Sequence, residues 1–213
     1  MFNSDKIKAV LYEIIETVVV VTVLVIAIRF FIGEPRWIPS ASMRATLLEG
    51  DRVFIEKLTH FYSKPERGDI LVFYPPFEAL AGNPWAIFTR LVGFGSKDVA
   101  YIKRVIGTPG DTIEIKNDKK TKSSSVYING KKLKETYLYE PKMDLCTENM
   151  YCGPIKIPTD KYFMMGDNRN NSQDSRYWGM LPQDRVIGRA KFIFWPINRV
   201  KVLNAPEYKI TVK

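Results

Sequence analysis

Four polar stretches of the chain contain residue types that nucleophilic and acid–base chemistry needs. They read Pro-Ser-Ala-Ser-Met-Arg-Ala-Thr-Leu over 39–47, Arg-Gly-Asp-Ile over 67–70, Tyr-Ile-Lys-Arg-Val over 101–105, and Gly-Asp-Asn-Arg-Asn-Asn-Ser-Gln-Asp-Ser-Arg over 166–176. Each stretch could be an ordinary turn, because Gly, Asn, Asp and Ser favour turns. A serine hydroxyl becomes a useful nucleophile only when a nearby base accepts its proton. Nucleophilic chemistry at one of these serines would therefore need a base from elsewhere in the chain.

The single histidine of the chain, His60, narrows the choice of base. A Ser-His-Asp triad must use His60 or not exist, and a site with several histidine ligands is excluded. The two cysteines are too few for a four-cysteine zinc site. We therefore expect no metal site and no cofactor.

Lys103 has a sequence context that is unusual for a lysine. The run 101–106 alternates as a strand does, which places Lys103 on one face and Arg104 on the other. Whichever face is buried, one cation goes inside and needs a partner or a use.

Most of the chain after residue 32 reads as β-structure. Short β-rich runs cover 51–56, 69–74 and 112–116, and Asn129-Gly130 between apolar runs predicts a hairpin over 126–133. The aromatic-rich segment Pro75–Val99 is expected to be a loop with a short helix, either packed on the core or resting on a membrane surface. The predicted fold is mainly β, with coiled antiparallel sheets.

The N-terminal region is strongly apolar. The uncharged run 17–28 is short for a membrane span, but 10–32 reaches span length with its three charged residues toward the ends. Three interpretations stay open: a signal peptide cleaved near Ser40-Ala41-Ser42, a buried core helix, and a membrane anchor. The valine-rich composition without helical periodicity favours the anchor. Flanking charges nearly balance, so they do not fix its orientation.

Charge and cysteine spacing bear on the environment of the rest of the chain. Cys146 and Cys152 are close enough for a disulfide, which would require an oxidising compartment, although two free thiols remain an alternative. The net charge is +9, and seven lysines lie between Lys116 and Lys134. These form a solvated face or contact anionic lipid. No recognition motif accompanies them, so nucleic acid is not an expected partner.

Together and in this order, the four stretches resemble the conserved boxes of bacterial type I signal peptidases. The resemblance covers about residues 34–197 and the N-terminal anchor. It implies that Ser42 is the nucleophile, Lys103 the general base, and Ser40 with the Ser42 backbone N–H the oxyanion hole. It further implies that Ser172 orients the lysine. The implied supporting ion pairs are Arg104 with Asp167 and Arg176 with Asp174.

The resemblance also implies a substrate and a location. The substrates would be secretory preproteins with small residues before the cut. The enzyme would be a monomer in the plasma (inner) membrane, in contact with the bilayer, with a cytoplasmic N-terminus and an extracytoplasmic catalytic domain. The implied pocket walls are Ile38, Pro39, Met43, Leu47, Val53, Tyr101 and Ile102. One departure is visible: Ala45 stands where the family usually has proline, which loosens the loop but removes no catalytic group.

The expected division of the chain follows from these elements. An anchor region over 1–32 precedes a catalytic core over 33–110, with 75–99 as an apolar insertion, a small β subdomain over 111–162, and the rest of the core over 163–213. Two other functions remain: a self-cleaving Ser-Lys protease of the repressor type, and a non-enzymatic tethered β-domain. Penicillin-binding enzymes are excluded, because no serine has a lysine three residues later.

Overall fold

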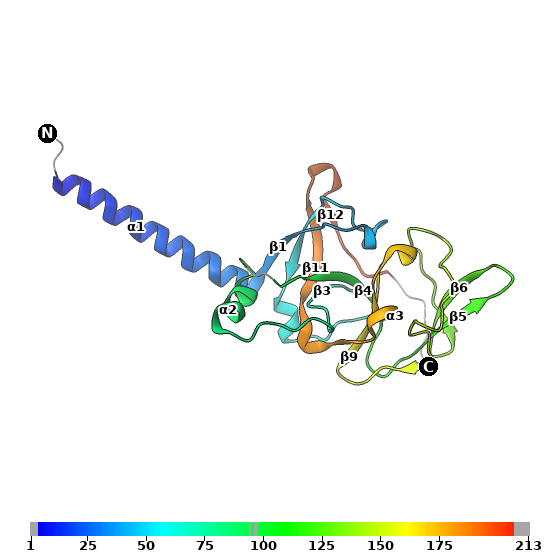
Figure 1. The fold of residues 1–213 in the computed structure, drawn as a ribbon. Helices are drawn as coiled ribbons and strands as arrows, with labels where there is room; N and C mark the ends of the chain where they lie inside the picture. The colour runs from blue at the N-terminus through cyan, green and yellow to red at the C-terminus, as the bar shows by residue number, and fades with distance from the viewer. Residues whose placement is uncertain (1–3, 94, 96–97, 207–213) are drawn as a thin grey trace.

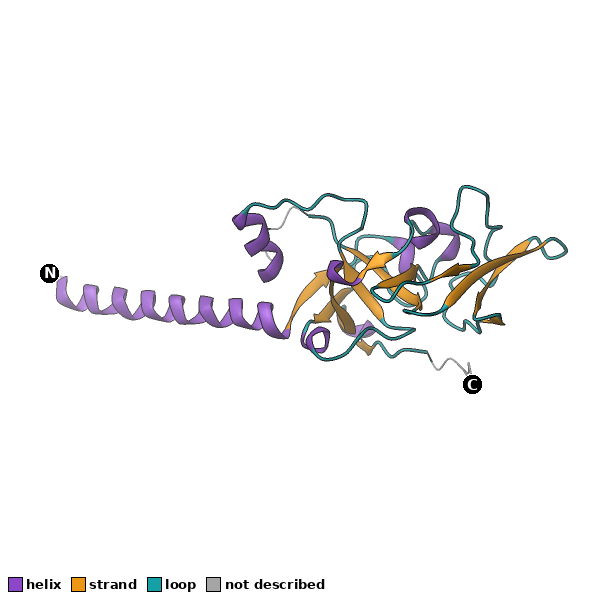
Figure 2. Ribbon diagram, turned by 90° about the horizontal axis from the view of Figure 1, so that it is seen from below, coloured by secondary structure: helices purple, strands orange, loops and turns teal. Residues whose placement is uncertain are grey.

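The computed structural model describes residues 4–93, 95 and 98–206, which form one long helix followed by two antiparallel sheets (Figure 1). The helix α1 (Ser4–Ala27) continues into a π-helical turn at Ile28–Ile32. It projects from the β-structure into open space (Figures 1 and 2). Most of the large apolar side chains of α1 are exposed, so the helix does not pack against the β-structure.

Within the described residues, one helix is long and apolar enough to cross a membrane. It covers Ile7–Ile32, has a mean hydropathy of 2.5, and none of its most apolar part is buried. A core helix of a soluble domain would be mostly covered by protein, so that interpretation was wrong. The exposed valine and isoleucine side chains are consistent with lipid contact.

The larger sheet carries most of the strands. Its path is β1 (Gly33–Trp37), β2 (Arg52–Glu56), β11 (Val186–Trp195), β3 (Ile70–Phe73), β4 (Tyr101–Gly107), β9 (Lys161–Met165) and β10 (Leu181–Pro182), and β12 (Lys201–Val202) also pairs with β11. The pairing of β11 shifts register at Ala190/Phe192 and Ile193/Trp195, where irregularities bend a strand and increase its twist. The expected mainly β fold with coiled antiparallel sheets is confirmed.

The smaller sheet has the order β7 (Lys131–Lys132), β6 (Ser123–Ile128), β5 (Thr112–Asp118) and β8 (Ile155–Lys156). The predicted hairpin is present, and both turn residues have positive φ, 51° at Asn129 and 77° at Gly130. Its lysine-rich end lies far from α1 in both views (Figures 1 and 2). The anionic-lipid interpretation of these lysines therefore loses support, and a solvated face fits the fold.

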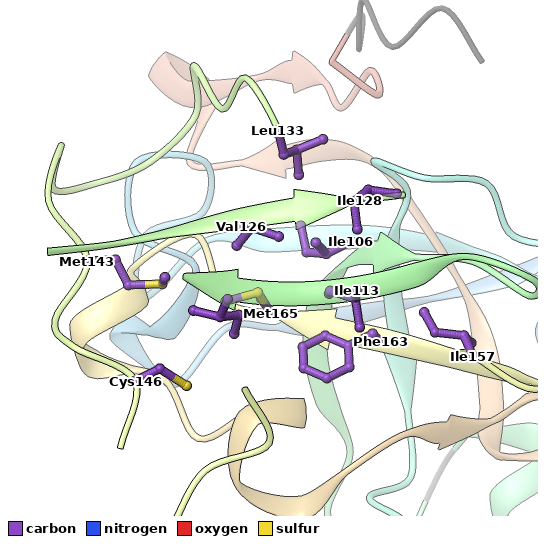
Figure 3. Packing of buried hydrophobic residues seen from close by; sticks show 11 residues of the cluster. Ile106, Ile113, Val126, Ile128, Leu133, Met143, Cys146, Ile157, Phe163 and Met165 are labelled. Carbon is purple, nitrogen blue, oxygen red and sulfur yellow. The ribbon is translucent and has the colours of Figure 1, made fainter. Parts of the chain in front are cut away.

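Buried side chains from both sheets form a shared core (Figure 3). Ile106 and Phe163 of the larger sheet pack with Ile113, Val126 and Ile128 of the smaller one. Cys146 belongs to the same cluster and forms a disulfide with Cys152. The two sheets thus share apolar contacts, and the division of the chain at residues 111 and 162 stays a prediction.

The segment Pro75–Val99 contains the short helix expected from sequence, α2 (Pro84–Val92). Asn83 caps its N-terminus by accepting a hydrogen bond from the Ala86 N–H, and Pro84 occupies the first turn. Gly93 ends it in the left-handed conformation at φ 68°. Trp85 and Phe88 are exposed, whereas Phe94 lies outside the described residues.

One further α-helical turn and several 3-10 turns connect the strands. The helical turn is α3 (Ser175–Trp178), and the 3-10 turns are Ala41–Met43, Leu58–Phe61, Arg169–Asn171, Gln183–Arg185 and Ile197–Arg199. Two of these 3-10 turns, Ala41–Met43 and Arg169–Asn171, lie within two of the four polar stretches. The two turns contact each other, and the first also contacts β4.

Candidate active site

Ser42 and Lys103 lie 61 residues apart in the chain and meet in the fold. Ser42 sits in the 3-10 turn that follows β1, and Lys103 is the third residue of β4. The Lys103 Nζ lies 2.7 Å from the Ser42 Oγ and also donates to the Ile102 carbonyl at 3.1 Å. A serine hydroxyl and an amine at this distance can exchange a proton directly.

Lys103 is almost fully enclosed, with 4% of its surface exposed. Burial disfavours the charged ammonium and lowers the pKa of Lys103 from 10.5 to about 8, against the opposing influence of Asp174 and Asp167. At a pKa of about 8, an appreciable fraction of the amine is neutral near neutral pH. The neutral amine is the form that can accept a proton.

Strand β4 is buried on both faces, which goes beyond the sequence prediction that one cation would be inside. Lys103 and Arg104 point to opposite faces, and both are less than 5% exposed. Other parts of the chain cover each side chain: the Ser42 turn contacts Lys103, while Asp167 and Gly68 contact Arg104. A strand in the middle of a covered sheet has no solvent face, so both cations need compensation.

Arg104 receives that compensation from the buried carboxylate of Asp167. Its Nε and Nη2 reach the two Asp167 carboxylate oxygens at 2.8 and 2.6 Å, and its Nη1 donates to the Gly68 carbonyl at 2.8 Å. Thr46 donates to the same carboxylate at 2.5 Å. Bidentate pairing of this kind is geometrically specific. The network therefore joins all four polar stretches behind the Ser42–Lys103 pair.

The second expected ion pair, Asp174 with Arg176, is also formed and fully buried. The Arg176 Nε and Nη2 contact the Asp174 oxygens at 2.8 and 2.9 Å. Asp174 also accepts a hydrogen bond from the Gly166 N–H at 3.0 Å. These contacts hold the 166–176 stretch in a fixed conformation beside Lys103.

An open groove of about 360 Å³ leads to the Ser42 and Lys103 side chains. Its walls come from the turn before Ser42, the start of β4 and the 166–176 stretch. The lining residues are Pro39, Ser40, Ala41, Ser42, Val99, Ala100, Tyr101, Ile102, Lys103, Asn171 and Gln173. The Ser40 Oγ lies 3.3 Å from the Ser42 Oγ and faces the same groove.

Comparisons with known proteins identify the family of the chain. Residues 11–195 match the family model described as signal peptidase, peptidase S26. The chain belongs to this family. A signal peptidase I of Leptolyngbya laminosa is 40% identical over 96% of this chain and 89% of the relative. A signal peptidase I of Bacillus licheniformis is 35% identical over 93% of this chain and 96% of the relative.

A solved structure was also found. It is a signal peptidase I of Enterococcus faecalis V583, which is 29% identical and covers 61% of this chain and 98% of its own, with a TM-score of 0.40.

One implied contact of the signal peptidase site is not formed. The Ser172 Oγ is buried and has no hydrogen-bond partner among the described residues, Lys103 included. It packs against Gly166, where a Cβ would come within 2.3 Å of this oxygen and 2.4 Å of the Ser42 carbonyl. Gly166 thus permits the close approach, and the lysine-orienting role of Ser172 stays a prediction.

The implied pocket walls divide into two groups. Pro39, Tyr101 and Ile102 line the groove. The other four do not line it and belong to a buried apolar cluster that also includes Ile102: Ile38, Met43, Leu47 and Val53. Their contact with a substrate stays a prediction.

Three further residues of the site had no individual role in the sequence prediction. Asn168 holds the Ser42 turn, because its backbone N–H donates to the Ser42 carbonyl and its Nδ2 to the Ala41 carbonyl, both at 3.1 Å. Asn171 and Gln173 line the groove. All three lie in the quoted 166–176 stretch, whose density of polar residues was the available signal.

Ala45, which stands where signal peptidases usually have proline, has a conformation that proline cannot adopt. Its φ is 81°, whereas the proline ring holds φ near −65°. Ala45 is exposed, and the turn before it keeps its hydrogen bonds from the N–H groups of Arg44 and Thr46. The loop after Ser42 therefore follows its own backbone path in this chain.

Proposed function

We propose that this member of the signal peptidase family is a membrane-bound serine endopeptidase that removes signal peptides from exported preproteins with a Ser42–Lys103 dyad. The observation that carries the proposal is the 2.7 Å contact between the Lys103 Nζ and the Ser42 Oγ, together with the lowered pKa of Lys103. Ser40, Arg104 and Asp167 have supporting roles in this account.

The dyad would act in two steps. Neutral Lys103 takes the proton of the Ser42 hydroxyl while the Oγ bonds to the scissile carbonyl carbon. As the carbon–nitrogen bond breaks, the lysine gives that proton to the leaving amine, and an ester to Ser42 remains. Water then attacks the ester with Lys103 again accepting a proton, and the serine hydroxyl is restored. No cofactor takes part in either step.

The negative charge that develops on the substrate oxygen requires nearby donors. We assign this role to the Ser42 backbone N–H and the Ser40 hydroxyl, which lies 3.3 Å from the Ser42 Oγ. Loss of one such donor typically lowers the rate by about 10²–10³-fold. Ser40→Ala is therefore expected to be slow but not inactive.

The groove is suited to a short extended peptide with small side chains near the cut. Its volume is about 360 Å³, and Ser42 and Lys103, which line it, are themselves buried, so little space is open beside the scissile bond. A bulky side chain at that position would have to displace the neighbouring walls. Cleavage after small residues is the expected preference.

The helix over Ile7–Ile32 supports a single-pass anchor. We place residues before this helix in the cytoplasm and residues 33–213 outside the plasma membrane, because the Cys146–Cys152 disulfide requires an oxidising compartment. Protease added outside intact spheroplasts should digest the β-domain. Complete protection would reverse the orientation.

The function is tested with detergent-solubilised protein and a preprotein carrying alanine at the first and third positions before the cut. Mass spectrometry of the products should show one new N-terminus immediately after these residues. A matched preprotein with tryptophan at the first position should remain intact. Cleavage of both preproteins at scattered sites, or of neither, would contradict the proposal.

A further inference from the structure

A second buried charge cluster lies outside the catalytic site, where the anchor helix joins the β-domain. Its centre is Glu34, the second residue of β1, whose side chain is completely buried. Lys57 contacts the Glu34 Oε2 at 2.9 Å, and the Nε of Arg36 contacts the Oε1 at 2.5 Å. Arg29 approaches the same carboxylate at 3.9 Å. The catalytic mechanism uses none of these groups.

The cations of this cluster also hold the C-terminal end of α2. Arg29 donates from its Nε to the Val92 carbonyl at 2.7 Å and from its Nη2 to the Gly93 carbonyl. Lys57 donates to the Leu91 carbonyl at 3.2 Å. The last carbonyls of a helix have no partner within the helix and carry partial negative charge, so cations stabilise them. One carboxylate and one helix end thus compensate three cations.

The cluster also binds the anchor itself. The Lys57 Nζ donates to the Arg29 carbonyl at 3.0 Å, and Arg29 belongs to the last turn of the helical span. A Cβ on Gly93 would lie 1.5 Å from the Glu34 Oε2, so only glycine lets α2 approach this closely. Four elements, the anchor end, β1, the residue after β2 and α2, therefore meet at one carboxylate.

The location of this junction connects it with the active site. The chain leaves α2 at Gly93 and reaches the groove wall at Val99–Lys103, while β1 leads from Glu34 to Ser42. Figures 1 and 2 show α2 beside the end of α1. Two segments that line the groove are thus connected, a few residues earlier in the chain, to the cluster that holds the anchor.

We propose that Glu34, Lys57 and Arg29 form a rigid joint that fixes the catalytic groove relative to the membrane anchor, so that the groove meets the cleavage site of a membrane-inserted preprotein. The inference rests on the proposed function. Glu34, Lys57 and Arg29 are positioning residues in this account, since none touches the reacting atoms. A misplacement of about 1 Å can lower a rate by about 10²-fold.

The test compares Arg29→Gln with Arg36→Gln. Both variants remove one cation from Glu34, but only Arg29 contacts α2. In vesicles, Arg29→Gln should lower kcat/KM for a membrane-inserted preprotein about tenfold or more, and leave that for a short soluble peptide within about twofold. Arg36→Gln should change kcat/KM by the same factor for the two substrates. Gly93→Ala, which displaces α2 without removing a charge, should reproduce the selective loss.

The proposed joint would be refuted if Arg29→Gln lowered kcat/KM equally for both substrates, or for neither. A measurement that does not depend on catalysis tests the joint even if the proposed function is wrong. Spin labels replace Tyr12 on α1 and Trp85 on α2, both of which are exposed, and the natural cysteines are bonded and do not react. The distance distribution between the labels should be narrow in the parent and broad with Arg29→Gln. Unchanged width would also refute the joint.

Discussion

Replacement of Lys103 by methionine should stabilise the protein while it removes activity. The burial that lowers the pKa of Lys103 from 10.5 to about 8 means that the folded state holds this proton less tightly than the unfolded state. A difference of about 2.5 pKa units corresponds to about 3 kcal/mol at pH 7. Lys103→Met avoids this cost but loses the Nζ–Oγ hydrogen bond, worth about 1 kcal/mol. We therefore expect Lys103→Met to raise the free energy of unfolding at pH 7 by about 2 kcal/mol.

The pH dependence identifies the cause. Between pH 8 and 10.5 the unfolded state binds more protons than the folded state, so the stability of the parent rises with pH in this range. The penalty on Lys103 falls from about 3 kcal/mol at pH 7 to about 1 kcal/mol at pH 9.5. The difference in free energy of unfolding between Lys103→Met and the parent should therefore shrink by about 2 kcal/mol from pH 7 to pH 9.5.

The assay is urea unfolding of both detergent-solubilised proteins at pH 7 and pH 9.5. A methionine variant that is less stable at pH 7 would refute the reasoning, and so would an advantage that is the same at both pH values. Either outcome would mean that Lys103 is not held in a strongly desolvated site.

Four further predictions follow from the same structure. Cleavage should rise about tenfold from pH 7 to pH 9, because the neutral fraction of a lysine of pKa about 8 rises over this range, and a flat profile would contradict a lysine base. Replacing both Cys146 and Cys152 with serine should lower the free energy of unfolding by about 2 kcal/mol, the value for a short closed loop, with little change in kcat; unchanged stability would contradict it. Ala45→Gly should raise the melting temperature slightly and Ala45→Pro should lower it, because φ is 81°; the opposite order would contradict this backbone. A protein lacking residues 1–32 should bind vesicles through exposed Trp85 and Phe88 and lose binding when both become serine; no binding by the unaltered domain would refute membrane contact.

Local sequence patterns were sufficient to predict much of the fold. Asn129-Gly130 identified the hairpin because its turn requires positive φ at both positions, and these are found. The short helix within Pro75–Val99 was expected, as were the strands around residues 53, 72 and 103. Such signals depend only on neighbouring residues, so they are available without a structure.

Features that depend on distant parts of the chain were not predictable in the same way. Strand alternation assigned one buried cation to β4, yet both Lys103 and Arg104 are buried because other strands and loops cover each face. The Glu34 cluster joins residues up to 64 positions apart, and nothing in their local sequence indicates that contact. The resemblance gave the pairing of Ser42 with Lys103, whereas residue types alone left it as one option.

The most direct test of the dyad is cleavage of one preprotein in vesicles by the parent, Ser42→Ala, Lys103→Met and His60→Ala. The side chain of His60 lies outside the described part of the structure, but its position in the sequence falls in none of the four polar stretches. Removing a nucleophile or its base typically costs about 10⁴-fold or more in kcat. The account predicts that loss for Ser42→Ala and Lys103→Met, and near-parent cleavage for His60→Ala. Near-parent cleavage by Lys103→Met, with strong loss on changing His60, would contradict it.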